Sequence, residues 1–298
     1  MRELDALSVP TEPAEAPAIK PVRASDRGLV CTAQPRPENG PPVESVWDAI
    51  DREAGTLAIH EPLLESRLRR CVLEWRTPAE RIAATLASRL GADDLPESSL
   101  RSFFVELLCD APQLLAMAER DIVAVLDRDP STPLALYVLL NQKGFHALQT
   151  HRLCHALWQA GRQGMALTLA SAASQRFGVD IHPAARIGSN VMLDHGTGIV
   201  IGETAVIDDA VSILQGVTLG GTGKECGDRH PKIGAGVLIG AGATVLGNIR
   251  IGAQSKVAAG SVVLDAVPPR CTVAGVPARI VRRHETQSAP ALDMDQAI

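Results

Sequence analysis

Histidine and aspartate side chains are concentrated in the segment VDIHPAARIGSNVMLDHGTG, residues 179–198. His195 is a candidate general base, because an imidazole near its ordinary pKa accepts a proton readily at neutral pH. Asp180, upstream, is a candidate partner for the other ring nitrogen, where a carboxylate would fix the tautomer and stabilise the imidazolium. The alternative is that His182 and His195 only occupy corners of the fold, and the spacing leaves both interpretations open.

A second group of reactive side chains lies in the segment GKECGDRHPK, residues 223–232. Arg229 and His230 are adjacent here. A guanidinium can hold a carboxylate by two parallel hydrogen bonds, so the pair is a candidate binding site for a carboxylate group. The alternative is a solvated basic loop without a ligand.

Two further groups carry weaker signals. Arg279 lies with two more arginines in GVPARIVRR, a basic cluster that could meet phosphate groups. His151 and His155 have the i, i+4 spacing of a zinc site on a helix. No glutamate follows His151 as it would in an H-E-x-x-H motif, so we interpret both as packing residues and predict no metal site.

The elements that position these groups are indicated by a six-residue period. Aliphatic side chains recur at Ile181, Ile187, Leu193, Ile199, Ala205, Val211, Val217, Ile233, Ile239, Val245, Ile251, Val257 and Val263. This period is typical of a parallel β-helix, in which three hexapeptides complete one coil, and it predicts a little over four coils. No aromatic residue follows Phe177, which suits a narrow prism. A β-sandwich would show period two instead. The period breaks only across 223–232, which we expect to protrude as a loop.

Residues 43–178 have helical signals. Thr77 and Glu80 form the pattern of a capping box, and Asp110 with Gln113 repeats it. A further amphipathic helix is expected over the segment GFHALQTHRLCHALWQAG. These patterns predict an α-helical domain before the β-helix.

Composition limits the remaining possibilities. Residues 1–42 are rich in proline and lack aromatic residues, so we predict a disordered extension. The net charge of −5, without a basic tract, disfavours binding to nucleic acid or to an anionic membrane surface. The six cysteines are scattered and no secretory signal or membrane span is evident, which predicts reduced thiols and a cytoplasmic location.

The chain resembles the bacterial serine O-acetyltransferases. The resemblance is carried by RDPSTP at 128–133, KGFHALQTHR at 143–152, VDIHPAARIG at 179–188, LDHGTGIVIGET at 193–204, TLGGTGKECGDRHPKIG at 218–234 and AGVPARIV at 274–281. It implies an α + β fold: an N-terminal α-helical oligomerisation domain (43–178), a left-handed parallel β-helix catalytic domain of hexapeptide repeats (179–283) and a flexible C-terminal tail (284–298). The implied reaction transfers acetyl from acetyl-CoA to the L-serine hydroxyl, the first step of cysteine biosynthesis.

The resemblance also implies roles for individual residues. His195 would act as general base with Asp180 orienting it, and Arg229 with His230 would hold the serine carboxylate. Asp194 and Asp129 would hold the serine ammonium. The residues that would line the acetyl-CoA arm are Gly221, Thr222, Ala241, Lys256 and Ala259, and Arg279 joins them by its charge.

The family further implies homotrimers formed through the prisms, paired into hexamers through the helical domains. L-Cysteine would inhibit at the serine site, and the C-terminal tail, ending in Ile298, would bind O-acetylserine sulfhydrylase. We expect acetyl-CoA as a co-substrate and no permanently bound cofactor. Cys226 is a conceivable acyl carrier, but we favour direct transfer with Cys226 as a bystander.

Three other functions are alternatives to this one. An acetyltransferase of the same fold acting on a sugar or antibiotic would not need an Arg–His pair for a carboxylate. A β-helix metalloenzyme such as a carbonic anhydrase needs three convergent histidines, and residues after 178 include only His182, His195, His230 and His284. A non-enzymatic scaffold would hold the sulfhydrylase without catalysis.

Overall fold

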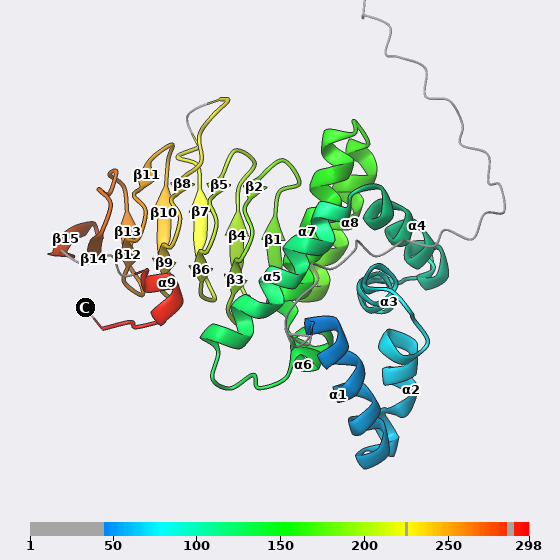
Figure 1. Ribbon diagram of the computed structural model, residues 1–298. Helices are drawn as coiled ribbons and strands as arrows, with labels where there is room; N and C mark the ends of the chain where they lie inside the picture. The colour runs from blue at the N-terminus through cyan, green and yellow to red at the C-terminus, as the bar shows by residue number, and fades with distance from the viewer. Residues whose placement is uncertain (1–44, 224–225, 285–288, 298) are drawn as a thin grey trace, which may run out of the picture. The chain divides into compact units, whose positions relative to one another are not determined.

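The computed structural model describes residues 45–223, 226–284 and 289–297, all within one compact unit (Figure 1). The predicted disordered extension, residues 1–42, lies outside the described residues. A helical domain is followed by a stack of short strands, so the predicted order of the two domains is confirmed.

The helical domain begins at α1. Its elements are α1 (Val46–His60), η1 (Pro62–Leu64), α2 (Glu65–Leu68), η2 (Arg69–Leu73), α3 (Pro78–Leu90), α4 (Glu97–Asp110), α5 (Pro112–Arg128), α6 (Ala135–Asn141), α7 (Lys143–Gln159) and α8 (Gln163–Phe177). The capping box at α3 is confirmed: Glu80 N donates to Thr77 Oγ1 at 3.3 Å, and Thr77 N donates to Glu80 Oε2 at 2.9 Å.

The second predicted capping box is wrong. Asp110 is still part of α4, and the N-cap of α5 is Ala111, which makes no side-chain cap. Pro112 explains the shift, because the residue before a proline is disfavoured in the helical region. The chain therefore breaks at Ala111 rather than at Asp110.

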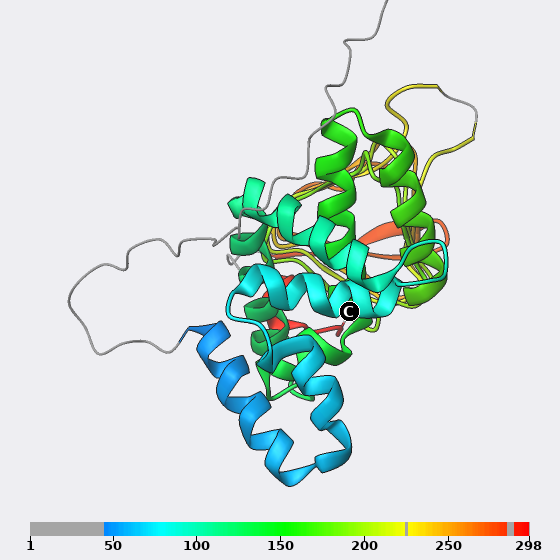
Figure 2. The same ribbon diagram turned by 90° about the vertical axis from the view of Figure 1, so that its right-hand side faces the viewer.

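Helix α7 is buried on nearly all sides, which corrects the expectation of an amphipathic helix. It packs against α4, α5, α6 and α8 and against the first strands of the β-helix, β1 and β3. Figure 2 shows the helices gathered across one end of the stacked strands. The one-sided pattern is lost because polar side chains are buried along with the apolar ones: Gln149 Nε2 and Arg152 Nε both donate to Asp121 Oδ2, at 2.9 and 3.0 Å.

The β-domain is a parallel β-helix with three faces. Face I contains β1 (Val179–Ile181), β4 (Ile199–Ile201), β7 (Thr218–Gly220), β10 (Thr244–Leu246) and β13 (Val262–Val263). Face II contains β2 (Arg186–Ile187), β5 (Val206–Ile207), β8 (Lys232–Ile233) and β11 (Arg250–Ile251). Face III contains β3 (Met192–Leu193), β6 (Ser212–Ile213), β9 (Leu238–Ile239), β12 (Lys256–Val257), β14 (Cys271–Gly275) and the antiparallel β15 (Ala278–Arg283).

The predicted period specifies the core of this prism. Every residue of the period is buried except Ile187, which is partly buried. The prism has about five coils, more than the sequence predicted, because Val267 and Val273 continue two faces after the six-residue spacing has ended. The described residues between β7 and β8, 221–223 and 226–231, project from the prism as expected, although Lys232 already belongs to β8 (Figure 1). Residues 224 and 225 of the predicted loop lie outside the described residues.

The last described residues return to the prism. Pro290–Asp293 form the short helix α9, which lies beside β9 and α5. Among the described residues, no helix is long and apolar enough to cross a membrane. Cys71, Cys154, Cys226 and Cys271 are free thiols, whereas Cys109 is disulfide-bonded, so the expectation of reduced thiols is wrong at that position.

Candidate active site

Two edges of the prism carry the predicted site residues. We call the turns that join face III to face I the His195 edge; they are residues 194–198, 214–217, 240–243 and 258–261. We call the turns that join face I to face II the loop edge; they include residues 202–205 and the described part of the long connection, residues 221–223 and 226–231. Both edges expose loop backbone on a rigid stack of strands.

His195 is presented outward by a tight turn between β3 and β4. Its φ is 55° and that of Gly196 is 75°, so both adopt the left-handed conformation that non-glycine residues seldom take. The imidazole is 73% exposed. The turn is pressed against α7: a Cβ on Gly144 would lie 1.9 Å from the carbonyl oxygen of Leu193. Close packing by α7 therefore holds a strained turn in place, as is common at functional sites.

Asp194 and Asp129 lie close enough to His195 to interact electrostatically with it. Asp194 Oδ1 is 4.0 Å from His195 Nε2. Burial raises the pKa of the Asp194 carboxyl, and the charge of Asp129 adds to this effect against the opposing influence of His195. Two carboxylates from different domains thus converge beside one imidazole, an arrangement suited to a cation.

The carboxylate of Asp129 is fixed by its own turn. It follows the last residue of α5 and accepts hydrogen bonds from Ser131 N at 2.9 Å, Ser131 Oγ at 2.6 Å and Thr132 Oγ1 at 2.6 Å. Partial burial opposes ionisation, but these hydrogen bonds outweigh it and lower the pKa of Asp129. The carboxylate therefore stays charged. Sequence reasoning did not single out Ser131 and Thr132, although both stand in the quoted RDPSTP.

Asp180 lies on β1 with an exposed side chain, and its Cα pairs with that of Val200 on β4. No hydrogen bond or ion pair joins the described side chains of Asp180 and His195. The structure therefore does not place the two in contact, and the orienting role of Asp180 stays a prediction. His182 has a local role: its Nδ1 accepts a hydrogen bond from Ala184 N at 3.1 Å, and its ring meets Trp158 edge-on at 5.1 Å.

Arg229 and His230 lie together on the loop edge, as expected. Arg229 Nη2 donates to Glu203 Oε2 at 2.8 Å, and the Arg229 side chain is 31% exposed. His230 is buried, with its ring over Gly202, where a Cβ would lie 1.9 Å from His230 Cδ2. Burial lowers the pKa of His230, and the positive charge of Arg229 lowers it further. His230 is therefore a neutral imidazole at pH 7.

Both residues are anchored to the turn before β5. Thr204 Oγ1 accepts from Arg229 N at 3.0 Å and from His230 N at 3.1 Å. A cavity of about 260 Å³ lies beside this turn. It is lined by Ala184, Arg186, Glu203, Thr204, Ala205 and Asp228. Sequence reasoning missed Glu203 and Thr204, which end the quoted LDHGTGIVIGET.

The predicted acetyl-CoA residues are divided between the same two edges. Ala241 and Ala259 lie on the His195 edge, in successive coils joined by a hydrogen bond from Gly260 N to Ala241 O at 2.8 Å. This edge continues the turn of His195, coil by coil. Gly221 and Thr222 instead lie on the loop edge, directly after β7.

The remaining predicted residues lie elsewhere. Lys256, on β12, is buried, and its Nζ donates to the Ala297 carbonyl at 2.7 Å and lies 3.7 Å from Asp295 Oδ2. Arg279, on β15, is exposed, with Nη1 3.6 Å from Asp265 Oδ2. Ile298 lies outside the described residues, so its partner-binding role stays a prediction.

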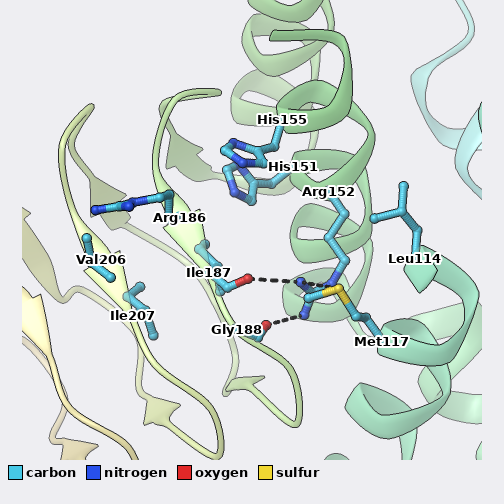
Figure 3. A pocket seen from close by; sticks show the side chains of 10 residues that line it. All are labelled: Leu114, Met117, His151, Arg152, His155, Arg186, Ile187, Gly188, Val206 and Ile207. Atoms are coloured by element: carbon cyan, nitrogen blue, oxygen red, sulfur yellow. Dashed lines mark hydrogen bonds between the residues drawn. The ribbon is translucent and has the colours of Figure 1, made fainter. Parts of the chain in front are cut away.

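A cavity of about 300 Å³ lies between α5, α7 and face II, and Arg186 lines both this cavity and the one beside Thr204 (Figure 3). His151 and His155 line it, with ring centroids 5.8 Å apart. Burial lowers the pKa of His151 to about 3, and His155 Nδ1 lies 2.8 Å from the Pro183 carbonyl. Within the described ranges, no three His, Cys, Asp or Glu side chains are grouped to hold a metal ion.

Two family models match the chain. Residues 46–150 match the N-terminal domain of serine acetyltransferase, and residues 230–265 match six repeats of the bacterial transferase hexapeptide. The serine acetyltransferase of Escherichia coli strain K12 is 50% identical over 254 residues, which cover 85% of this chain and 93% of that protein.

Solved structures agree with the sequence matches. A serine acetyltransferase in complex with cysteine superposes with a TM-score of 0.83 at 49% identity and covers 85% of this chain and 98% of that one. The enzyme of Brucella abortus strain S19 with coenzyme A gives 0.79 at 51% identity, covering 80% and 95%. The soybean enzyme with serine gives 0.79 at 49% identity, covering 81% and 100%.

Proposed function

The chain belongs to the serine acetyltransferases, and we propose that it transfers the acetyl group of acetyl-CoA directly to the L-serine hydroxyl with His195 as general base. The acyltransferase assignment follows from the family; the mechanism and the residue roles are the proposal. Its main support is the way in which the site residues are divided between two edges of the prism.

Two sets of site residues, Asp194 with His195 and Arg229 with His230, lie at the level of the same coil but on different edges of the prism. His195 and Asp194 lie at the start of the second coil, and the base of the loop is bonded to Thr204 in that same coil. Each edge also carries its own predicted acetyl-CoA residues. Since a substrate must meet both sets, we infer that the His195 edge of one copy faces the loop edge of the next. A closed trimer provides three such contacts, because its interfaces are head-to-tail.

The chemistry expected at this interface is a direct acyl transfer without an acyl-enzyme intermediate. The serine oxygen attacks the thioester carbonyl while His195 takes the hydroxyl proton, the new C–O bond forms, and the C–S bond breaks. The CoA sulfur leaves as thiolate and receives a proton. General-base catalysis of this kind typically contributes ~10²–10⁴-fold. Asp129 and Asp194 would pair with the serine ammonium and keep the amine from competing with the hydroxyl.

The ligands seen in relatives fit this scheme. Structures of related enzymes contain cysteine, coenzyme A and serine. We therefore propose L-cysteine as a feedback inhibitor that occupies the serine site, with acetyl-CoA as co-substrate. The pairing of trimers into hexamers, the binding of O-acetylserine sulfhydrylase by the tail and a cytoplasmic location belong to the same proposal and rest on the resemblance.

A thiol-release assay tests the proposed function. CoA release from acetyl-CoA should require L-serine and be far slower with a sugar. His195→Ala should lower kcat by about 10²-fold or more, whereas His60→Ala, a change at an exposed histidine of α1, should not. Serine-dependent release that survives His195→Ala would contradict the mechanism. A faster reaction with the sugar would contradict the substrate.

A further inference from the structure

Thr204 connects the turn before β5 to the base of the long loop. Its hydroxyl oxygen accepts hydrogen bonds from Arg229 N at 3.0 Å and from His230 N at 3.1 Å. Its backbone carbonyl accepts a hydrogen bond from Lys232 Nζ at 2.9 Å. One residue thus fixes the backbone of both members of the proposed carboxylate site.

Thr204 also determines which nitrogen of His230 carries the proton. With two amides donating to its oxygen, the hydroxyl has its own hydrogen left to donate, and His230 Nδ1 lies 2.9 Å away. Thr204 N points at the same ring nitrogen from 3.2 Å. Two donors at Nδ1 require an unprotonated acceptor there, so the neutral ring carries its hydrogen on Nε2.

This tautomer matters for a carboxylate. A carboxylate only accepts hydrogen bonds, so a neutral histidine can bind it only through a protonated nitrogen. Because Nδ1 of His230 accepts hydrogen bonds from Thr204, the Nε2–H group is the donor that remains available to a ligand. Glu203, next in sequence, holds the guanidinium of Arg229 at 2.8 Å. Residues 203 and 204 of this turn therefore orient the side chains of Arg229 and His230.

We propose that Thr204 is a positioning residue for serine recognition: its hydroxyl and amide fix His230 as an Nε2–H donor and align it with Arg229 toward the substrate carboxylate. This inference rests on the proposed function, because it assumes that Arg229 and His230 bind that carboxylate. Thr204 itself does not touch the substrate.

The test compares acceptors with and without the carboxylate. L-Serinamide keeps the hydroxyl and the ammonium of L-serine but lacks the negative charge. Thr204→Val removes the hydroxyl and keeps the shape, Thr204→Ser restores the hydroxyl, and Thr168→Val removes a hydroxyl that bonds a backbone carbonyl on α8, away from the site. The readout is the ratio of kcat/KM for L-serine to kcat/KM for L-serinamide.

We expect Thr204→Val to lower this ratio about tenfold, through a higher KM for L-serine, because tenfold corresponds to about 1.4 kcal/mol, which is about the net value of one hydrogen bond to the substrate carboxylate. Thr204→Ser should restore the ratio, and Thr168→Val should leave it unchanged. A structural role would reduce both acceptors by the same factor. Equal reductions, or an unchanged ratio, would overturn the inference.

Arg229→Ala separates this inference from the proposed function. If Arg229→Ala leaves the ratio intact, the carboxylate site itself is misplaced and the proposed roles of Arg229 and His230 fail. If Arg229→Ala abolishes the preference for L-serine while Thr204→Val does not, only the role of Thr204 fails. Should Thr204→Val not fold, Thr204→Ala replaces it, since it lacks the hydroxyl and adds no methyl group, and the same ratio decides.

Discussion

Replacing Gly144 with alanine is expected to slow catalysis through the position of His195. The α carbon of Gly144, in the first turn of α7, faces the end of β3, and an added Cβ would lie 1.9 Å from Leu193 O and 2.9 Å from Leu193 C. Real Cβ atoms do not approach other heavy atoms closer than 3.0 Å, so helix and turn must separate by more than an ångström. The residue directly after this contact is Asp194, followed by His195.

The magnitude follows from this displacement. A misplacement of about 1 Å at a reacting group can cost about 10²-fold in rate, and overpacking a filled core costs about 1–3 kcal/mol of stability. We therefore expect Gly144→Ala to lower kcat by about 10²-fold, with the KM for acetyl-CoA little changed. Steady-state kinetics and thermal unfolding of the purified variant measure the two effects.

Gly55→Ala is the matched control. Gly55 lies inside α1, where an added Cβ meets nothing within 4 Å, so alanine should stabilise the helix by up to about 1 kcal/mol and leave kcat unchanged. A kcat for Gly144→Ala within about threefold of wild type would refute the idea that close packing by α7 positions the histidine.

Two more predictions concern the pH dependence of stability and the packing of His230 against Gly202. Burial lowers the pKa of His146 to about 4 and that of His151 to about 3, so the unfolded chain takes up more protons below pH 6.5 and stability falls as pH falls. Protonation of each histidine in the unfolded chain should lower the free energy of unfolding by about 2 kcal/mol between pH 8 and pH 5. Urea unfolding of His151→Gln should therefore depend less on pH than that of wild type, and an unchanged dependence would contradict this. His60→Gln, at an exposed histidine, is the control. Gly202→Ala should displace His230 and raise the KM for L-serine about tenfold or more, whereas an equal rise in the KM for acetyl-CoA would argue against a local effect.

The period of six predicted the prism well because one physical requirement repeats in each coil. Every face must place an aliphatic side chain in a narrow core, and residues such as Ile199 and Val245 meet this requirement with full burial. The last coil was missed because Val267 and Val273 satisfy the same requirement without the spacing. The helical domain was predicted in outline, but the enclosure of α7 depends on tertiary packing that a one-sided pattern does not encode.

The candidate site residues could be proposed from the sequence, but their geometry could not. Arg229 and His230 were found because they interrupt a regular repeat. Thr204 was not predicted because threonine is common in the turns of such coils, and its role depends on hydrogen bonds from Arg229 and His230 in the following coil. Asp180 remains out of contact with His195, and no sequence pattern reports such a distance.

The central claim is that the site forms between the His195 edge of one copy and the loop edge of another. It is tested most directly by mixing two impaired variants, His195→Ala and Arg229→Ala, through unfolding and reassembly together, with activity assayed at an L-serine concentration too low for Arg229→Ala. If the site lies between copies, random trimers should recover about a quarter of the wild-type sites, because each such site needs an intact edge from each variant. If the site lies within one chain, every site in the mixture contains one of the two substitutions. The mixture would then be no more active than the separate variants, and that result would contradict the account.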